Sequence, residues 1–177
     1  MFKKISILIL LLNMGAVSQA GPTENQGWGR VRMTGSIIDA ACAIDINSTD
    51  QTIDMGPVPV SRVIKGSYGI RKKLSINLVN CILSKDKTEP GKWRYFTITF
   101  DGVNDDGLFS VEGDAKGIAI KIIDDNGNIA RPGESLPSEN IESGSMALNF
   151  SLQLVSNNQE LHAGEFNSII KFKMDYY

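Results

Sequence analysis

Apolar and polar residues alternate with a period of two over several stretches of the chain, and no stretch sustains a period of 3.6 residues. Alternation of this kind is typical of β-strands with one face in a core and the other toward solvent. The predicted strands carry their apolar residues at Leu74, Ile76 and Leu78, at Phe96, Ile98 and Phe100, at Ile118, Ile120 and Ile122, at Met146, Leu148, Phe150, Leu152 and Leu154, and at Phe166, Ile170, Phe172, Met174 and Tyr176.

Turn-forming residue pairs separate these stretches, and the Asn-Gly pair is the strongest signal for a two-residue hairpin. The pairs are Asp101-Gly102, Asp106-Gly107, Asn126-Gly127, Pro132-Gly133 and Asn157-Asn158. Six or seven short strands joined by turns predict an all-β sandwich. The chain has no internal repeat and no low-complexity linker, so we expect a single domain, over residues 35–177.

The first twenty residues have the pattern of a secretory signal peptide. Lys3 and Lys4 precede an apolar run over residues 5–14, and Ser18 and Ala20 offer a cleavage site. The run is too short to span a bilayer, and a buried N-terminal helix is the alternative interpretation. We therefore expect export across a membrane, a signal peptide over residues 1–20, and Gly21 as the start of the mature protein.

Residues 21–34 form a separate segment with little apolar content at its start. From Gly27 onward the period of two resumes, with Gly27, Gly29, Val31 and Met33 on one side. This is a candidate strand with no evident place in a six-strand sandwich. It could be donated to another molecule, or Val31 and Met33 could begin the first strand of the domain's own sheet.

Charge and cysteine content limit the possible partners. Without the two lysines of the signal peptide, 16 basic residues face 20 acidic ones, a net charge of −4 that argues against nucleic-acid binding. Cys42 and Cys81 are the two cysteines, and export favours a disulfide between them. Two free buried thiols or two metal ligands are the alternatives, and metal binding is disfavoured because His162 is the single histidine of the sequence.

Catalysis is not indicated. A hydrolase of the serine type needs a nucleophile, a base and an orienting acid, and the sequence offers His162 but no G-x-S-x-G motif. Asp124, Asp125, Asn126 and Asn128 resemble part of a calcium loop without its bidentate glutamate, and a hairpin turn explains them better. We expect neither an enzyme nor a cofactor, metal or small-molecule substrate.

Several motifs occur together along the chain. Gly164 is fourteenth from the C-terminus, Tyr176 is penultimate, and apolar and polar residues alternate between them. With the spacing of Cys42 and Cys81 and the segments 53–56 and 78–81, they make the sequence resemble the pilins of the chaperone-usher pathway. The resemblance implies an immunoglobulin-like sandwich that lacks its seventh strand. Such a sandwich has a hydrophobic groove that is filled by a strand from another chain.

Within that family, the segments 115–118, 127–131, 161–164 and 172–176 are similar to the P-pilus minor subunit that terminates and anchors the rod. This implies a structural minor subunit at the base of a fimbrium, on the outer membrane. A polymerising minor or major rod pilin is the alternative. A receptor-binding adhesin module is a further one, although 157 mature residues leave little room for a second domain.

The resemblance also implies partners and site residues. A periplasmic chaperone would pair with the C-terminal strand and grip the carboxylate of Tyr177, an outer-membrane usher would follow, and neighbouring pilins would then exchange strands with the subunit. The chaperone-binding residues would be Gly164, Phe166, Ile170, Phe172, Met174, Tyr176 and Tyr177, and the donor-strand residues Gly27, Gly29, Val31 and Met33. Localisation would be periplasmic first and then on the cell surface, in the fimbrium.

Overall fold

The computed structural model describes residues 29–35, 37, 40–64, 71–83 and 93–177. The chain divides into two units, Met1–Ile37 and Ile38–Tyr177. The described residues of the first unit, 29–35 and 37, belong to no helix or strand. The second unit contains every helix and strand that the structure describes.

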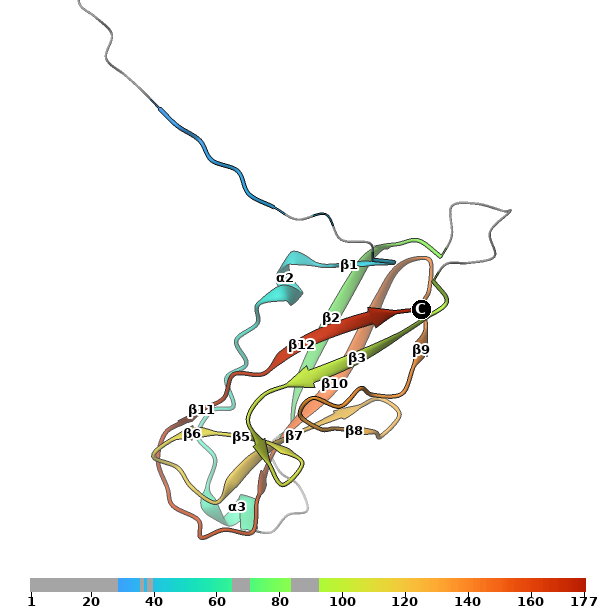
Figure 1. Ribbon diagram of the computed structural model, residues 1–177. Helices are drawn as coiled ribbons and strands as arrows, with labels where there is room; N and C mark the ends of the chain where they lie inside the picture. The colour runs from blue at the N-terminus through green and yellow to red at the C-terminus, as the bar shows by residue number, and fades with distance from the viewer. Residues whose placement is uncertain (1–28, 36, 38–39, 65–70, 84–92) are drawn as a thin grey trace, which may run out of the picture. The chain divides into compact units, whose positions relative to one another are not determined.

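The larger sheet of the second unit is antiparallel and has the strand order β1-β2-β10-β7-β5-β4, with β8 paired to β7 (Figure 1). The longest strands, β2 and β10, pair from Leu78 with Met146 to Arg71 with Gln153. The bounds are β1 Ala43–Ile44, β2 Arg71–Cys81, β4 Asn104–Asp105, β5 Leu108–Ser110, β7 Ile118–Asp124, β8 Ile129–Ala130 and β10 Gly144–Ser156.

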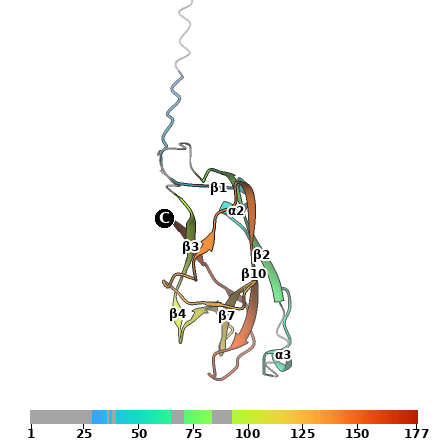
Figure 2. The same cartoon turned by 90° about the vertical axis from the view of Figure 1, so that its right-hand side faces the viewer.

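A second antiparallel sheet has the order β12-β3-β9, and β6 and β11 form a separate two-stranded pair. Figure 2 shows the two layers from the side, with β3 in one and β2 and β10 in the other. The bounds are β3 Tyr95–Asp101, β6 Glu112–Gly113, β9 Glu139–Asn140, β11 Phe166–Asn167 and β12 Lys171–Tyr176; two short helices, α2 Ile46–Thr49 and α3 Val60–Ile64, lie before β2 in the chain. The all-β sandwich predicted from the sequence is confirmed.

The core lies between the layers and uses the apolar positions that alternation predicts. Ile76, Leu78, Phe96, Phe100 and Ile122 are almost fully buried. The rings of Phe100 and Phe150, from opposite layers, meet edge to face with centroids 5.0 Å apart. Each such side chain contributes roughly 1.5 to 3 kcal/mol on burial, so these strands hold the two sheets together.

Strand β3 differs from the prediction of a half-buried strand, because both of its faces are covered. Thr97 and Thr99 are buried, as are the apolar residues that alternate with them, Phe96, Ile98 and Phe100. Their hydroxyls lie 2.6 Å from the Tyr177 hydroxyl and 2.8 Å from the Ser135 hydroxyl. The polar side chains can be buried because each has a hydrogen-bond partner.

The alternation predicts one continuous C-terminal strand over residues 166–176, and this prediction is wrong, because the segment forms two strands. Phe166 and Asn167 pair with β6, whereas Lys171 to Tyr176 pair with β3. Between them the Ser168 hydroxyl donates a hydrogen bond to the carbonyl oxygen of Ser110 at 2.8 Å. The two ends therefore have different partner strands, and a local pattern carries no information on that difference.

The Asn126-Gly127 pair does lie in a hairpin, between β7 and β8, but the loop is longer than two residues. The loop comprises residues 125–128. The Asp124 carboxylate stabilises it by accepting hydrogen bonds from the backbone N–H and the side-chain amide of Asn128, both at 2.7 Å. Gly127 has φ +87°, which glycine adopts without steric strain. The disulfide between Cys42 and Cys81 is present and links the start of β1 to the end of β2.

Candidate functional site

The free edge of β12 is the main feature of the candidate site. Strand β12 is the end strand of its sheet and pairs with β3 from Lys171 with Asp101 to Tyr176 with Phe96 (Figure 1). Among the described residues, no strand pairs with its other edge. That edge presents backbone N–H and C=O groups to any chain that can extend the sheet.

The inward-facing side chains of β12 are only half buried, although they pack against the core. Phe172 lies against Phe100 with ring centroids 6.3 Å apart, and Tyr176 meets Trp93 edge to face at 6.2 Å. Burial raises the pKa of the Tyr176 hydroxyl above its ordinary value. Met174 lies between Phe172 and Tyr176 on the same face and is also half buried, so all three side chains keep part of their apolar surface exposed.

Among the described residues, the larger sheet also has a strand edge that is only partly paired, along β2. The short β1 pairs with β2 at Leu78 and Val79, and in the described part of the chain no strand continues along β2 toward Arg71. The Tyr176 hydroxyl donates to the carbonyl oxygen of Cys42 at 3.4 Å, so the β12 and β1 ends of the two sheets lie on one side of the sandwich. We call this side the open side.

Further half-buried apolar side chains pack against the core from the segment between α2 and α3 and from the start of β2. They are Ile53, Met55, Val58 and Leu74. Together with the β12 side chains they form an apolar surface next to strand edges that have no partner among the described residues. It can bind an extended segment with apolar side chains at alternate positions.

The remaining predicted C-terminal residues are held by neighbouring strands. Phe166 pairs with Gly113, and a Cβ on Gly164 would lie 2.6 Å from the backbone nitrogen of Ala115. Ile170 is half buried against the core. Tyr177 extends the pairing with β3, since its N–H donates to the oxygen of Tyr95 at 2.9 Å. The main-chain oxygen of Tyr177 accepts from the N–H groups of Arg94 and Tyr95 at 2.7 and 3.1 Å.

The predicted donor residues lie in the first unit. Gly27 lies outside the described residues, as does the predicted signal peptide. Gly29, Val31 and Met33 belong to no strand, and the side chains of Val31 and Met33 are 87% and 90% exposed. The first strand that the structure describes begins at Ala43.

Other kinds of site find little support in the parts of the chain that are described. No group of three or more His, Cys, Asp or Glu side chains there is placed to hold a metal ion. The imidazole of His162 is exposed and lies 4.0 Å from the Glu160 carboxylate. None of the helices in these segments is long and apolar enough to cross a membrane. The sequence pattern pointed to Asp124 and Asp125 but not to Glu139 and Glu142, which line a pocket with them only in the folded sandwich.

An antiparallel sandwich with an open side of this kind is a pilin fold of the immunoglobulin type, and two solved structures share it. A subunit of a chaperone-usher pilus superimposes with a TM-score of 0.70 and 24% identity, over 89% of this chain and 100% of the other. The P-pilus rod subunit PapA gives a TM-score of 0.65 at 24% identity, over 78% of this chain and 100% of its own.

Sequence relatives specify the family. The fimbrial protein model matches residues 31–177, and the PRS fimbrial minor pilin of Escherichia coli is 33% identical over 156 residues, 86% of this chain and 80% of its own length. The major MR/P fimbria protein of Proteus mirabilis is 30% identical over 98% of this chain and 99% of its own. The chain belongs to the fimbrial protein family, as a chaperone-usher pilin close to minor pilins, and it is not an enzyme.

Proposed function

We propose that this pilin is a structural minor subunit assembled by donor-strand exchange: a strand from another chain fills its open side, and its own segment 21–34 fills the open side of a neighbour. The observation that carries the proposal is the free edge of β12 beside the half-buried Phe172, Met174 and Tyr176. Further support comes from the exposure of Val31 and Met33. Their spacing of two residues suits pockets beneath an added strand.

The energetics would couple folding to assembly. Four or five apolar side chains inserted at roughly 1.5 to 3 kcal/mol each amount to about 10 kcal/mol, which equals the stability of a typical small domain. A subunit with an empty open side would aggregate, so a periplasmic chaperone would supply the first strand at β12, and an outer-membrane usher would arrange the exchange. Residues 1–20 would direct export to the periplasm, before the subunit joins a fimbrium on the cell surface.

The acceptor half of the proposal is tested by producing the chain in the periplasm with and without a pilus chaperone. Without one, we expect aggregation, or a monomer that binds a hydrophobic dye such as anilinonaphthalene sulfonate and melts without cooperativity. With one, the protein should be soluble and should no longer bind the dye. A lone monomer with a cooperative melt and no dye binding would contradict the proposal.

The donor half is tested by the double variant Val31→Asp with Met33→Asp. Its charges should prevent insertion into a neighbour, so the subunit should be absent from purified fibres while its chaperone complex keeps the parent melting temperature. The matched control is Val103→Asp, which alters a 65% exposed apolar residue in the second unit. Normal incorporation of the double variant would refute a donor role for these residues.

We further propose that the subunit terminates and anchors the rod. The support is its 33% identity to the PRS and PAP minor pilins of E. coli. Deletion of the gene should give longer fibres that are shed into the medium, measured by electron microscopy and by antigen in the supernatant. A polymerising pilin is the second candidate, favoured by the alignment to a major fimbria protein over nearly its full length, and it predicts few or no fibres after deletion.

A further inference from the structure

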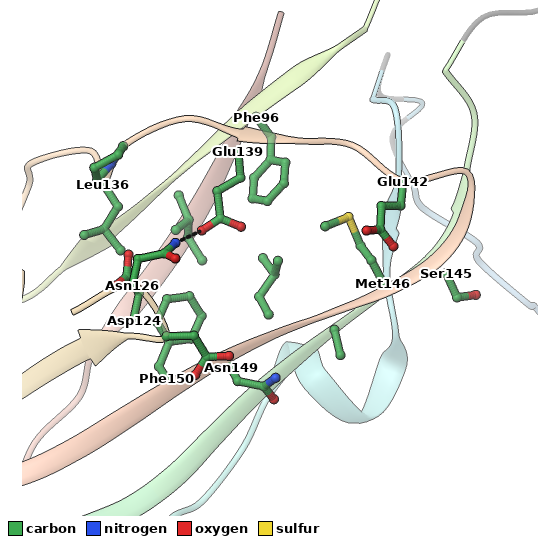
Figure 3. Close-up of a pocket in the computed structure, with 15 residues that line it drawn as sticks. Phe96, Asp124, Asn126, Leu136, Glu139, Glu142, Ser145, Met146, Asn149 and Phe150 are labelled. Carbon is green, nitrogen blue, oxygen red and sulfur yellow. Dashed lines mark hydrogen bonds between the residues drawn. The ribbon is translucent and has the colours of Figure 1, made fainter. Parts of the chain in front are cut away.

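The sandwich has a pocket on the side away from the open side, between β10 and the segment 136–142 that contains β9. Its volume is about 470 Å³. In Figure 3, Phe96 and Glu139 lie on one side of the pocket, and Asn149 and Phe150 lie on the other. The pocket exists because β7 pairs with β10 only from Phe150 onward, while β9 pairs with β3 in the opposite layer.

The floor of this pocket is apolar and one wall is a strand edge. The buried side chains of Phe96, Ile98, Leu136, Leu148 and Phe150 all line it. Along 146–149, β10 pairs with β2 on one side and, among the described strands, with none on the other. An extended chain could therefore form backbone hydrogen bonds with this edge while it covers the floor.

The charged groups that line the pocket are all acidic: Asp124, Asp125, Glu139 and Glu142. Asp124 accepts hydrogen bonds from Asn128, and Glu139 accepts one from the Asn126 side chain at 3.4 Å. Burial raises the pKa of Glu139, and the charges of Asp124 and Asp125 raise it further. Among the described residues that line the pocket there is no lysine, arginine or histidine, so this lining is acidic without a basic side chain.

We propose that this pocket binds an extended, arginine-bearing segment of a neighbouring pilus subunit, whose guanidinium group pairs with the carboxylates of Glu139 and Glu142. An arginine side chain fits both surfaces, because its aliphatic stem can cover an apolar floor while its planar head forms bidentate bonds to carboxylates. The apolar floor and the strand edge distinguish the site from a metal site, which needs convergent oxygen ligands. The inference rests on the proposed place of the chain in a fibre and adds a second contact surface to it.

The test uses two peptides that differ at one position, acetyl-Thr-Val-Arg-Val-Thr-amide and its twin with Glu in place of Arg. Each is titrated into the ¹⁵N-labelled secreted protein in its chaperone complex, so the open side is already occupied. The arginine peptide should shift the backbone amide signals of Glu139, Ala147 and Leu148, and the glutamate peptide should not. The double variant Glu139→Gln with Glu142→Gln should weaken binding about tenfold or more, since it removes both charge-assisted contacts.

The matched control is Glu134→Gln with Glu160→Gln, which changes the net charge equally at exposed residues that do not line the pocket. It should bind the arginine peptide as the parent does. The proposal is overturned by equal shifts with the two peptides, by no shift at 139–149, or by equal weakening in both double variants. The proposal is also overturned if calcium chloride shifts the amide signals of Glu139, Ala147 and Leu148 and the arginine peptide does not. The amide signals of Phe172 and Met174 report whether a strand occupies the open side. A failure of donor-strand exchange can therefore be distinguished from a failure of arginine binding in the pocket.

Discussion

Substitution of Gly164 by alanine tests whether this signature glycine is required by the packing of the domain itself. A Cβ at this position would lie 2.6 Å from the backbone nitrogen of Ala115 and 2.7 Å from the carbonyl carbon of Asp114. Real Cβ atoms essentially never come closer than 3.0 Å to such atoms, so the two backbones must separate. The separation would strain the bonds that the N–H groups of Asp114 and Ala115 donate to the oxygen of Glu165, at 3.0 and 3.1 Å.

The size of the effect follows from these contacts. Overpacking costs about 1 to 3 kcal/mol, and each of the two weakened hydrogen bonds costs about 0.5 to 1.5 kcal/mol, so Gly164→Ala should lower the free energy of unfolding by about 2 to 6 kcal/mol. The measurement is urea unfolding of the chaperone complex, followed by tryptophan fluorescence. Gly35→Ala is the control: no atom lies within 4 Å of its added Cβ, so its change should stay within about 0.5 kcal/mol.

The outcome that would refute this reasoning is an equal urea midpoint for the two alanine variants. The backbones near Gly164 would then tolerate a side chain, and packing would not explain the glycine. If Gly164→Ala kept the parent stability but failed to join fibres, the glycine would act in recognition by a partner.

Three further predictions concern the second unit. Replacing Cys42 and Cys81 by alanine should lower the free energy of unfolding by about 4 kcal/mol, because the unfolded chain is then no longer restrained by a disulfide between residues 39 positions apart. A loss below about 1 kcal/mol would contradict this. Ser48→Ala leaves the N–H of Asn77 without the buried hydroxyl that accepts from it at 3.0 Å, so stability should fall by about 1 to 3 kcal/mol, and an unchanged melting temperature would refute that role. The folded state raises the pKa of Glu139 above 4.5, so it binds that proton more tightly and stability falls as pH rises through the window above 4.5. By calorimetry, Glu139→Gln should therefore melt higher than the parent at pH 7 and equally at pH 4, whereas a lower melting temperature at pH 7 would contradict the sign.

Much of the fold follows from the sequence because strand faces are local properties. The period of two identified the core positions of β2, β3, β7 and β10, and the half-buried even-numbered positions near the C-terminus. Export and an even cysteine count predicted the bond between Cys42 and Cys81. The motif that ends in Tyr176 indicated the fimbrial protein family, to which the chain belongs.

What the tertiary structure decided is which strand edges have no partner among the described strands. Alternation says which face of β12 is apolar, but not that one edge of β12 is free or that Phe166 and Phe172 pair with different strands. It likewise gives no sign that Asp124 and Glu139 border one pocket, since they come from segments that pair with opposite layers. The physical reason is that side-chain periodicity is set within a strand, whereas pairing and the clustering of charges depend on contacts between residues far apart in the sequence.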